Sequence, residues 1–360
     1  MTRRSAHGSR GAFTLVEVLV ASAILVLMMG FLMGVMDQTT RIWSGTVAKV
    51  EQFREARVGF ERVTTRLAQA TLNTYWDYDY DTSTPPKPKR YARRSELRFI
   101  SGSAATLIGP TGPTGTTGTG ARVSHAVFFN APLGIIGNPN YTGLANALNS
   151  IGFFVELADD TEQRPPFITT AMIPARWRFR LMEFAQPTEN FSVYQFTNGA
   201  GATNYFGSQW FTNDVNGAST DGLKRVVAEN VIAFIITPRL AKAEEQPLQS
   251  NATHSPLAPN FSYNSTGTNA NPQLNPKNQL PPVVQLTMIA IDERSAEKLG
   301  LSATTQADIF KISALFADTA KFTADLATLE STLGASRVRY RIFTTNVHIR
   351  AAKWSREQIN

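Results

Sequence analysis

The chain contains no cysteine, which excludes disulfide bonds and thiolate metal sites. Its four histidines, His7, His125, His254 and His348, are scattered along 360 residues and show no metal-ligand spacing. It has no Walker loop, no HExxH motif and no GxSxG elbow. Nothing in the sequence therefore supports catalysis, and we predict a protein that is not an enzyme and needs no cofactor.

Charge of one sign is not concentrated anywhere in the chain. The net charge is +7, and without Arg3, Arg4 and Arg10 there remain 32 basic and 28 acidic residues. Nucleic-acid binding depends on clustered Lys and Arg residues that neutralise phosphates, and no such run is present. We therefore expect no nucleic-acid partner.

One long hydrophobic run is present, FTLVEVLVASAILVLMMGFLMGVM at residues 13–36, and Glu17 is its only ionisable residue. As a helix it reaches roughly 36 Å, which is enough to cross a hydrocarbon core of roughly 30 Å. Residues 1–12 contain three arginines and no acid, so the positive-inside rule leaves this end in the cytoplasm and exports the rest. The run is longer than the apolar core of an ordinary secretory signal. We expect a single-pass protein of the inner membrane.

The residues that enter this run, Gly11-Ala12-Phe13-Thr14-Leu15-Val16-Glu17, resemble the cleavage and methylation signal of type IV prepilins and type II secretion pseudopilins. The resemblance implies that a prepilin peptidase removes a basic leader, residues 1–12, and that the new N-terminal residue is methylated. A cut after Ala12 makes Phe13 the first residue and Glu17 the fifth, which is the family spacing. A cut after Gly11 keeps the family's usual glycine before the cut but makes Glu17 the sixth residue. The first cut is favoured.

Glu17 is expected to act in assembly. Phe13 and Glu17 are one helical turn apart, so a new N-terminal ammonium and the carboxylate share one face. Pairing within a chain or between neighbouring pilin-like subunits would neutralise a charge that lipid solvates poorly. The alternative is an uncleaved signal anchor whose Glu17 extends to the membrane surface.

An amphipathic pattern continues beyond the hydrophobic run. Apolar residues recur at spacings of three and four, with charged residues on the other faces. We expect residues 37–73 to extend the membrane helix and to pack one stripe on an exported head. The stripe comprises Trp43, Val47, Val50, Phe53, Ala56, Phe60, Val63, Leu67 and Ala70.

Residues 74–360 are expected to form this head, in an α+β fold with a mostly antiparallel sheet and one further helix within residues 292–333. Residues 102–120, with glycine at every third place in GPTGPTGTTGTG, and residues 242–282 are expected to be flexible loops. Runs rich in β-branched and aromatic residues predict the strands. They are Glu96–Ser101, Val123–Asn130, Ile151–Leu157, Trp177–Phe184, Phe191–Phe196, Val226–Thr237, Val283–Ile291 and Val338–Ile349.

The segment YWDYDYD follows the expected long helix. Its carboxylates, Asp77, Asp79 and Asp81, are weak candidates for a Ca²⁺ site, because the glycine of an EF-hand loop is replaced by Thr82. The favoured interpretation is a solvated acidic face with Tyr and Trp packed inward. A different function class is also open, an anchored exported protein that binds a ligand or glycan through aromatic residues around Trp76 and Trp210.

Several later stretches extend the family resemblance. FREARVGFERVTTRLAQATLNTYWDY resembles the J-type minor pseudopilins of type II secretion. With SELRFISG, LKRVVAENVIAFIITPRL, PPVVQLTMIAIDERSAEKLG and YRIFTTNVHIRAAKWS, it resembles the pilin-like family named Verru_Chthon cassette protein C. These resemblances imply a minor subunit of a type II secretion or type IV pilus-like apparatus, with a periplasmic head large enough for an initiating or capping position.

Overall fold

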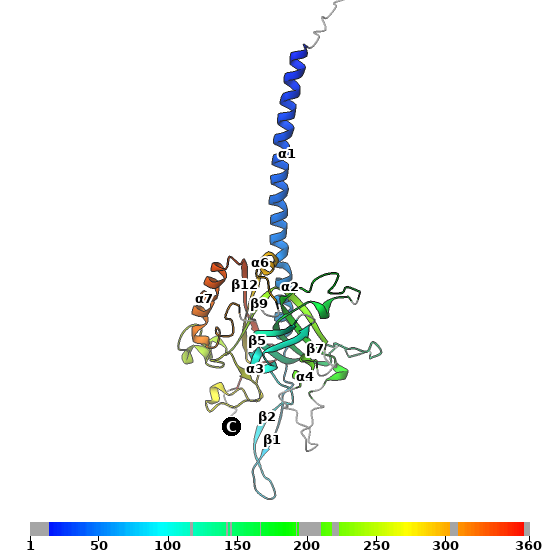
Figure 1. Cartoon of the computed structure of the whole chain (residues 1–360). Helices are drawn as coiled ribbons and strands as arrows, with labels where there is room; N and C mark the ends of the chain where they lie inside the picture. Colours follow the sequence, from blue (N-terminus) through cyan, green and yellow to red (C-terminus); the bar gives the residue numbers. More distant parts are fainter. Residues whose placement is uncertain are drawn as a thin grey trace, which may run out of the picture. The chain divides into compact units, whose positions relative to one another are not determined.

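The computed structural model has an α+β fold, as the sequence predicts, and divides into two compact units, residues 1–52 and 53–360. The structure describes residues 14–115, 118–141, 143–144, 146–165, 167–191, 193, 210–217, 223–302 and 309–355, and for residues 40–52, 115 and 118 it describes the backbone alone. The element order is shown in Figure 1.

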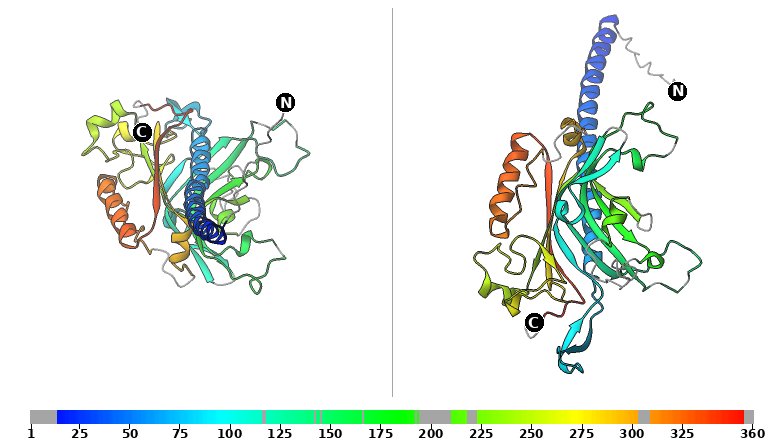
Figure 2. Two further views of the ribbon diagram at one scale, coloured as in Figure 1. Left: turned by 90° about the horizontal axis from the view of Figure 1, so that it is seen from above. Right: turned by 60° about the horizontal axis from the view of Figure 1, so that its bottom comes forward.

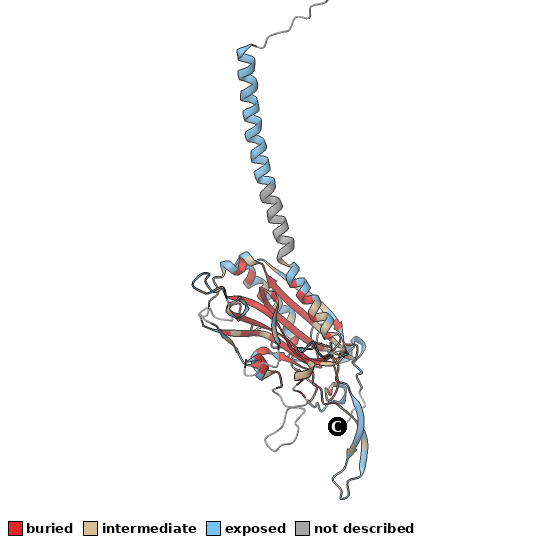
Figure 3. Cartoon of the chain, turned by 90° about the vertical axis from the view of Figure 1, so that its right-hand side faces the viewer, coloured by how far each residue is buried: buried red, intermediate tan, exposed pale blue. Residues whose placement is uncertain are grey.

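The first unit contains helix α1, Leu15–Gln52. Its segment Leu15–Thr39 is long and apolar enough to cross a membrane, a test that a signal sequence also passes. Figure 3 colours residues 14–39, which include this segment, as exposed. The expected uninterrupted helix over residues 37–73 is wrong in detail, because Phe53 leaves helical geometry and α2, Arg54–Leu67, begins after it.

Helix α2 belongs to the second unit and buries one stripe. Ala56, Phe60, Val63 and Leu67 are buried at spacings of three and four, as the sequence predicts, and Gly59, which the predicted stripe did not include, is buried beside them. The helix stops at Leu67 because the chain then turns to pair with a strand: the N–H of Thr71 donates to the carbonyl of Asn130 at 2.8 Å. The side chains of Trp43, Val47 and Val50 lie outside the described residues.

The larger sheet of the head is antiparallel and seven-stranded, in the order β10-β3-β5-β6-β7-β8, with β4 paired to β5. Strands β6 and β7 are buried almost throughout, and the buried polar side chains of β7 have ion-pair or hydrogen-bond partners; they are Arg178, Arg180, Glu183 and Gln186. The strands are β3 Ile100–Ser103, β4 Thr111–Gly115, β5 Gly118–Pro132, β6 Leu148–Ala158, β7 Arg178–Gln186, β8 Leu223–Glu229 and β10 Tyr263–Asn264.

A second, three-stranded antiparallel sheet has the order β12-β11-β9, with β9 Val231–Arg239, β11 Val283–Ile291 and β12 Tyr340–His348. The strand expected at Val226–Thr237 is therefore two strands, β8 and β9, in different sheets. Asn230 separates them with φ of 60°, a left-handed conformation in which asparagine is enriched.

The two sheets meet where β5 runs beside β9. A bulge in β5 turns Ser124 out of the ladder with φ of 64°. The Ser124 hydroxyl donates to the carbonyl of Phe234 at 2.6 Å and accepts the Phe234 N–H at 2.9 Å. One side chain thus takes the place of a strand partner and joins the sheets.

Short helices complete the head, and the helix expected over residues 292–333 is not continuous. Helix α6, Glu293–Lys298, ends before Gly300, whose φ of 56° suits a helix C-terminus. Helix α7, Phe322–Ala335, follows and lies beside β12 in both views of Figure 2. The remaining short helices are α3 Ala104–Ile108, α4 Thr212–Val215 and α5 Lys242–Glu245.

Three further expectations about loops and strands need correction. Residues 102–120 contain α3, β4 and the start of β5 rather than one flexible loop. Residues 242–282 are anchored in the core by Leu257, Phe261 and Tyr263, because these side chains are buried. Phe191 and Val193 are not in a strand, and the other residues of the range 191–196 lie outside the described residues.

Candidate functional site

The first candidate site is the start of α1, where Thr14 and Glu17 bind each other. The Thr14 N–H and hydroxyl both donate to Oε2 of Glu17, at 2.9 Å and 3.0 Å. The Glu17 N–H donates to the Thr14 hydroxyl oxygen at 3.4 Å. This is a capping box, which satisfies peptide groups that the first helical turn leaves free. The sequence Thr-Leu-Val-Glu contains that signal, which the sequence-based interpretation missed.

The surface around this carboxylate is apolar. From Leu15 to Met36 Glu17 is the only ionisable residue, and the large hydrophobic side chains of this stretch are exposed by 46% to 78%. Such a surface matches lipid or other apolar helices better than water. The processing residues expected from the sequence, Gly11, Ala12 and Phe13, lie outside the described residues.

The second candidate site is a hairpin that the sequence did not predict, β1 Tyr75–Tyr80 and β2 Pro88–Arg94. Trp76, Tyr78 and Tyr80 alternate along β1, so they share one face, and Tyr91 joins them with its ring 4.3 Å from that of Tyr78. We call these four residues the aromatic face. They are exposed by 40% to 59%, so the expectation that they pack inward is wrong.

The carboxylates of Asp79 and Asp81 in the hairpin form ion pairs or hydrogen bonds with neighbouring protein groups. Asp79 lies 3.0 Å from Arg90 and 3.1 Å from Arg94, and the hydrogen bond from Arg90 lowers the pKa of Asp79. Asp81 accepts hydrogen bonds from the Ser83 hydroxyl and the Lys87 N–H, and the first of these lowers its pKa.

Asp77 accepts the N–H of Tyr78 at 2.8 Å. Among the described residues, no group of three or more His, Cys, Asp or Glu side chains is arranged to hold a metal ion. The three aspartates are thus bound to protein groups and not gathered as ligands.

Trp210 does not join Trp76. It is 3% exposed and packs edge-on against Phe128 and Phe211, with ring centroids 6.4 Å and 4.9 Å away. The expectation of a ligand-binding surface around both tryptophans is therefore wrong for Trp210, which belongs to the core. Trp76, in contrast, is exposed.

A buried charged cluster attaches α2 to the larger sheet, and sequence reasoning missed it. Glu183 of β7 has a fully buried side chain and lies 2.7 Å from Arg62, 2.8 Å from Arg66 and 3.0 Å from Arg225. Arg62 and Arg66 are four residues apart on α2, so both reach the same carboxylate. The four-residue spacing of Arg62 and Arg66 was the only feature of the sequence that pointed to this cluster. Their partner Glu183 lies 121 residues after Arg62, and no local pattern connects it to them.

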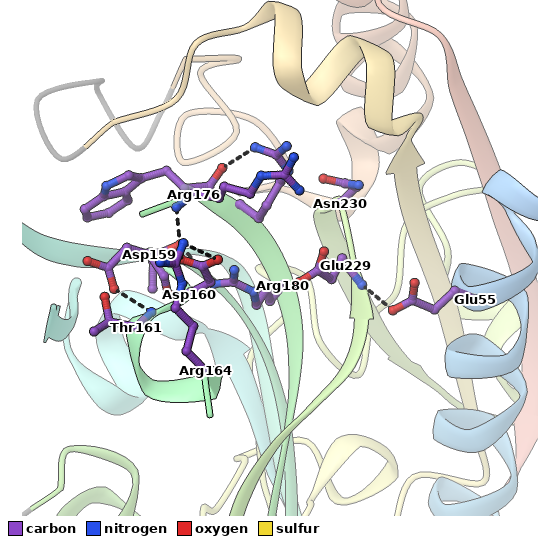
Figure 4. Close-up of polar contacts among 12 residues, drawn as sticks. Glu55, Asp159, Asp160, Thr161, Arg164, Arg176, Arg180, Glu229 and Asn230 are labelled. Atoms are coloured by element: carbon purple, nitrogen blue, oxygen red, sulfur yellow. Dashed lines mark hydrogen bonds and ion pairs between the residues drawn. The ribbon is translucent and has the colours of Figure 1, made fainter. Parts of the chain in front are cut away.

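A second α2 contact reaches the end of β8. The Glu55 carboxylate accepts the N–H of Glu229 at 3.0 Å, as Figure 4 shows. Gly59 lets the helix approach this strand closely, since a Cβ atom there would lie 3.0 Å from the Cβ of Ala228. The helix and the sheet are therefore fitted to each other by shape as well as by charge.

His125 is structural. The Ile236 N–H points at its Nδ1 from 3.3 Å, so Nδ1 accepts and the proton is on Nε2, which lies 3.2 Å from the Phe316 carbonyl. Burial lowers the pKa of His125 to about 4, and the ring is neutral at pH 7.

Described residues of the head line several hollows that chemistry or binding could use. A groove of about 670 Å³ lies between α2 and β12. A hollow of about 590 Å³ is lined by Arg239, His348 and Glu245, and burial raises the pKa of Glu245. One of about 340 Å³ lies at the base of the hairpin beside Arg93.

We compared the chain with known protein families, curated proteins and solved structures. No family model, no curated protein and no solved structure matches the chain.

Proposed function

We propose that the protein is a membrane-anchored, pilin-like structural subunit, a minor pseudopilin of a type II secretion or type IV pilus-like apparatus. A prepilin peptidase removes its leader at Gly11-Ala12-Phe13. The helix then holds the subunit in the inner membrane, with the head in the periplasm, and Glu17 pairs it with other pilin-like subunits.

One observation carries the proposal: an exposed apolar helix of membrane-spanning length has a single carboxylate near its start. Ionisable residues within membrane-spanning segments are rare and mark functional positions, although a carboxylate near the start of the span costs less than the roughly 2.5 to 3.5 kcal/mol of a charged residue at the helix centre. Cleavage after Ala12 puts an ammonium four residues before Glu17 and one residue before Thr14, which caps the helix. The prepilin resemblance of residues 11–17 supports the same assignment.

The capping box refines the role of Glu17. Thr14 supplies two hydrogen bonds to one carboxylate oxygen, Oε2, and these do not neutralise the charge. The negative charge is then available to an ammonium on the same chain or on a neighbouring subunit. Because Thr14 follows both cleavage positions, either cut leaves the capping box intact.

Intact-mass analysis of the protein extracted from membranes tests the processing step. We expect a mass that lacks residues 1–12 and carries one added methyl group. A mass lacking only residues 1–11 would place the cut after Gly11. Recovery of the full chain with Met1 from cells that contain the peptidase would overturn the proposal.

Two variants separate the charge of Glu17 from its capping role. Glu17→Gln keeps acceptor oxygen for Thr14 but removes the charge, whereas Thr14→Ala removes the capping hydroxyl and keeps the charge. We expect Glu17→Gln to abolish cross-linking to partner subunits in native membranes without impairing processing, and Thr14→Ala to retain both. Loss of cross-linking in Thr14→Ala with full retention in Glu17→Gln would mean that Glu17 acts only as a helix cap.

The aromatic face supports a second candidate function, an anchored protein whose head binds a glycan. Four exposed rings on one side of a two-stranded hairpin can stack on sugar rings, and Arg93 lies 5.5 Å above the ring of Trp76. Isothermal titration calorimetry with cellohexaose tests it, because the heat of binding does not depend on the Trp76 fluorophore. We expect Trp76→Ala to weaken binding about tenfold and Tyr141→Ala, which removes an exposed ring elsewhere, to have no effect. Absence of binding by the unaltered protein would remove this candidate.

A further inference from the structure

Strand β12 is an outer strand of the three-stranded sheet, and its free side has unused hydrogen-bonding groups. It pairs with β11 residue for residue from Tyr340 to His348, without a bulge and without proline. In the part of the chain that the structure describes, no hydrogen bond reaches its peptide groups on the side away from β11. Proteins usually protect such an edge with a bulge, a proline or a covering element, because it is a template for another strand.

The groove of about 670 Å³ between α2 and β12 follows this edge. It is lined by seven consecutive residues of β12, 341–347. A hollow on the face of a sheet would be lined by every second residue, because side chains alternate between the two faces. Seven residues of a strand extend about 23 Å, so the groove offers the length of an added strand.

The walls of the groove define which strand fits it. Phe343 points to the α2 side, where its ring centroid is 5.7 Å from that of Phe60, so this side accepts apolar side chains. Glu61 is already paired with Arg57 at 3.0 Å. Arg341 lies over the ring of Phe343 and, among the described residues, has no carboxylate partner. The groove therefore has an unbalanced positive charge at the N-terminal end of β12.

We propose that the β12 edge is the docking site for an extended acidic segment of another polypeptide chain, which joins the sheet antiparallel to β12. Backbone hydrogen bonds give affinity, while apolar side chains against Phe60 and Phe343 and a carboxylate at Arg341 give specificity. A second copy of β12 fits less well, because its sequence YRIFTTNVH would add a second arginine and no carboxylate to the seam. The inference depends on the head alone and does not require the pilin-like role.

A designed nine-residue peptide tests the inference on the full-length protein in detergent micelles. It has threonine at odd positions, valine at positions 2, 4 and 6 and glutamate at position 8, which antiparallel pairing places opposite Arg341. One control peptide has lysine at position 8, and another has alternate backbone nitrogens methylated. Fluorescence anisotropy measures binding, and amide hydrogen exchange locates it.

We expect the glutamate peptide to slow exchange of residues 340–348 and the methylated peptide not to bind. Arg341→Glu should weaken the glutamate peptide at least tenfold and improve the lysine peptide, whereas Arg294→Glu, an exposed arginine on α6, should change neither. Equal binding of the methylated peptide, or no protection of β12, would overturn the inference. Protection that appears without peptide as the protein dimerises would assign the edge to a second copy instead.

Discussion

Replacing Glu183 with glutamine should weaken the attachment of α2 to the sheet. The substitution keeps the shape of a fully buried side chain but removes the charge that three arginines share. Breaking a buried ion pair costs about 3 to 5 kcal/mol. Arg62, Arg66 and Arg225 keep 36%, 18% and 43% of their side-chain exposure and can partly recover hydration, so we expect the lower value.

Amide hydrogen exchange of residues 54–67 measures this effect directly. About 3 kcal/mol corresponds to roughly 100-fold faster exchange through local opening, at 1.36 kcal/mol per factor of ten. The matched control is Glu61→Gln on the same helix, which breaks the exposed pair with Arg57 and should accelerate exchange about twofold. If both variants behave alike, the buried cluster does not hold α2, and the reasoning fails.

Two further predictions concern the core of the head. Burial lowers the pKa of His125 to about 4, so between that value and about pH 6.5 the imidazole binds a proton in the unfolded chain but not in the folded one. The free energy of unfolding should therefore be highest above about pH 6.5 and fall by about 2 kcal/mol at pH 5. Urea unfolding at pH 7.5 and pH 5 measures this difference, and His125→Gln should remove it. An unchanged pH slope in that variant would contradict it. Gly59→Ala should destabilise the head by about 1 to 3 kcal/mol despite better helix propensity, because the new Cβ meets Ala228. The control Gly334→Ala, where a Cβ meets no atom within 4 Å, should stabilise it by up to about 1 kcal/mol in the same urea assay, and equal effects would refute the packing argument.

Sequence patterns predicted those parts of the fold that depend on local periodicity. Strand β11 runs from Val283 to Ile291, as expected, and the spacing of Phe60, Val63 and Leu67 identified the buried stripe of α2. In both cases the neighbouring residues alone decide which face is buried.

The errors arose where one residue or a distant contact decides the structure. Asn230 divides one apolar run into two strands by a single left-handed conformation. The polar composition of residues 242–282 suggested mobility, but Phe261 and Tyr263 are buried and fix the segment. Composition averages over such anchors and therefore hides them.

For the candidate site, the sequence predicted the apolar helix, and the role of Glu17 stays a prediction, but the sequence did not predict the contacts around Glu17. The Thr14 capping box was readable from residue spacing and was missed. The Glu183 cluster was not readable, because its members come from α2, β7 and β8 and meet only in the folded sheet.

The attachment of α2 also has a consequence for the order of folding. Its ion-pair partner Glu183 is synthesised 121 residues after Arg62, and the carbonyl of Ala68 accepts the N–H of Arg350 from the last part of the chain. Contacts so distant in sequence form late. During synthesis α2 must therefore wait with its apolar stripe uncovered, and a nascent chain halted before residue 183 should need a chaperone to shield that stripe.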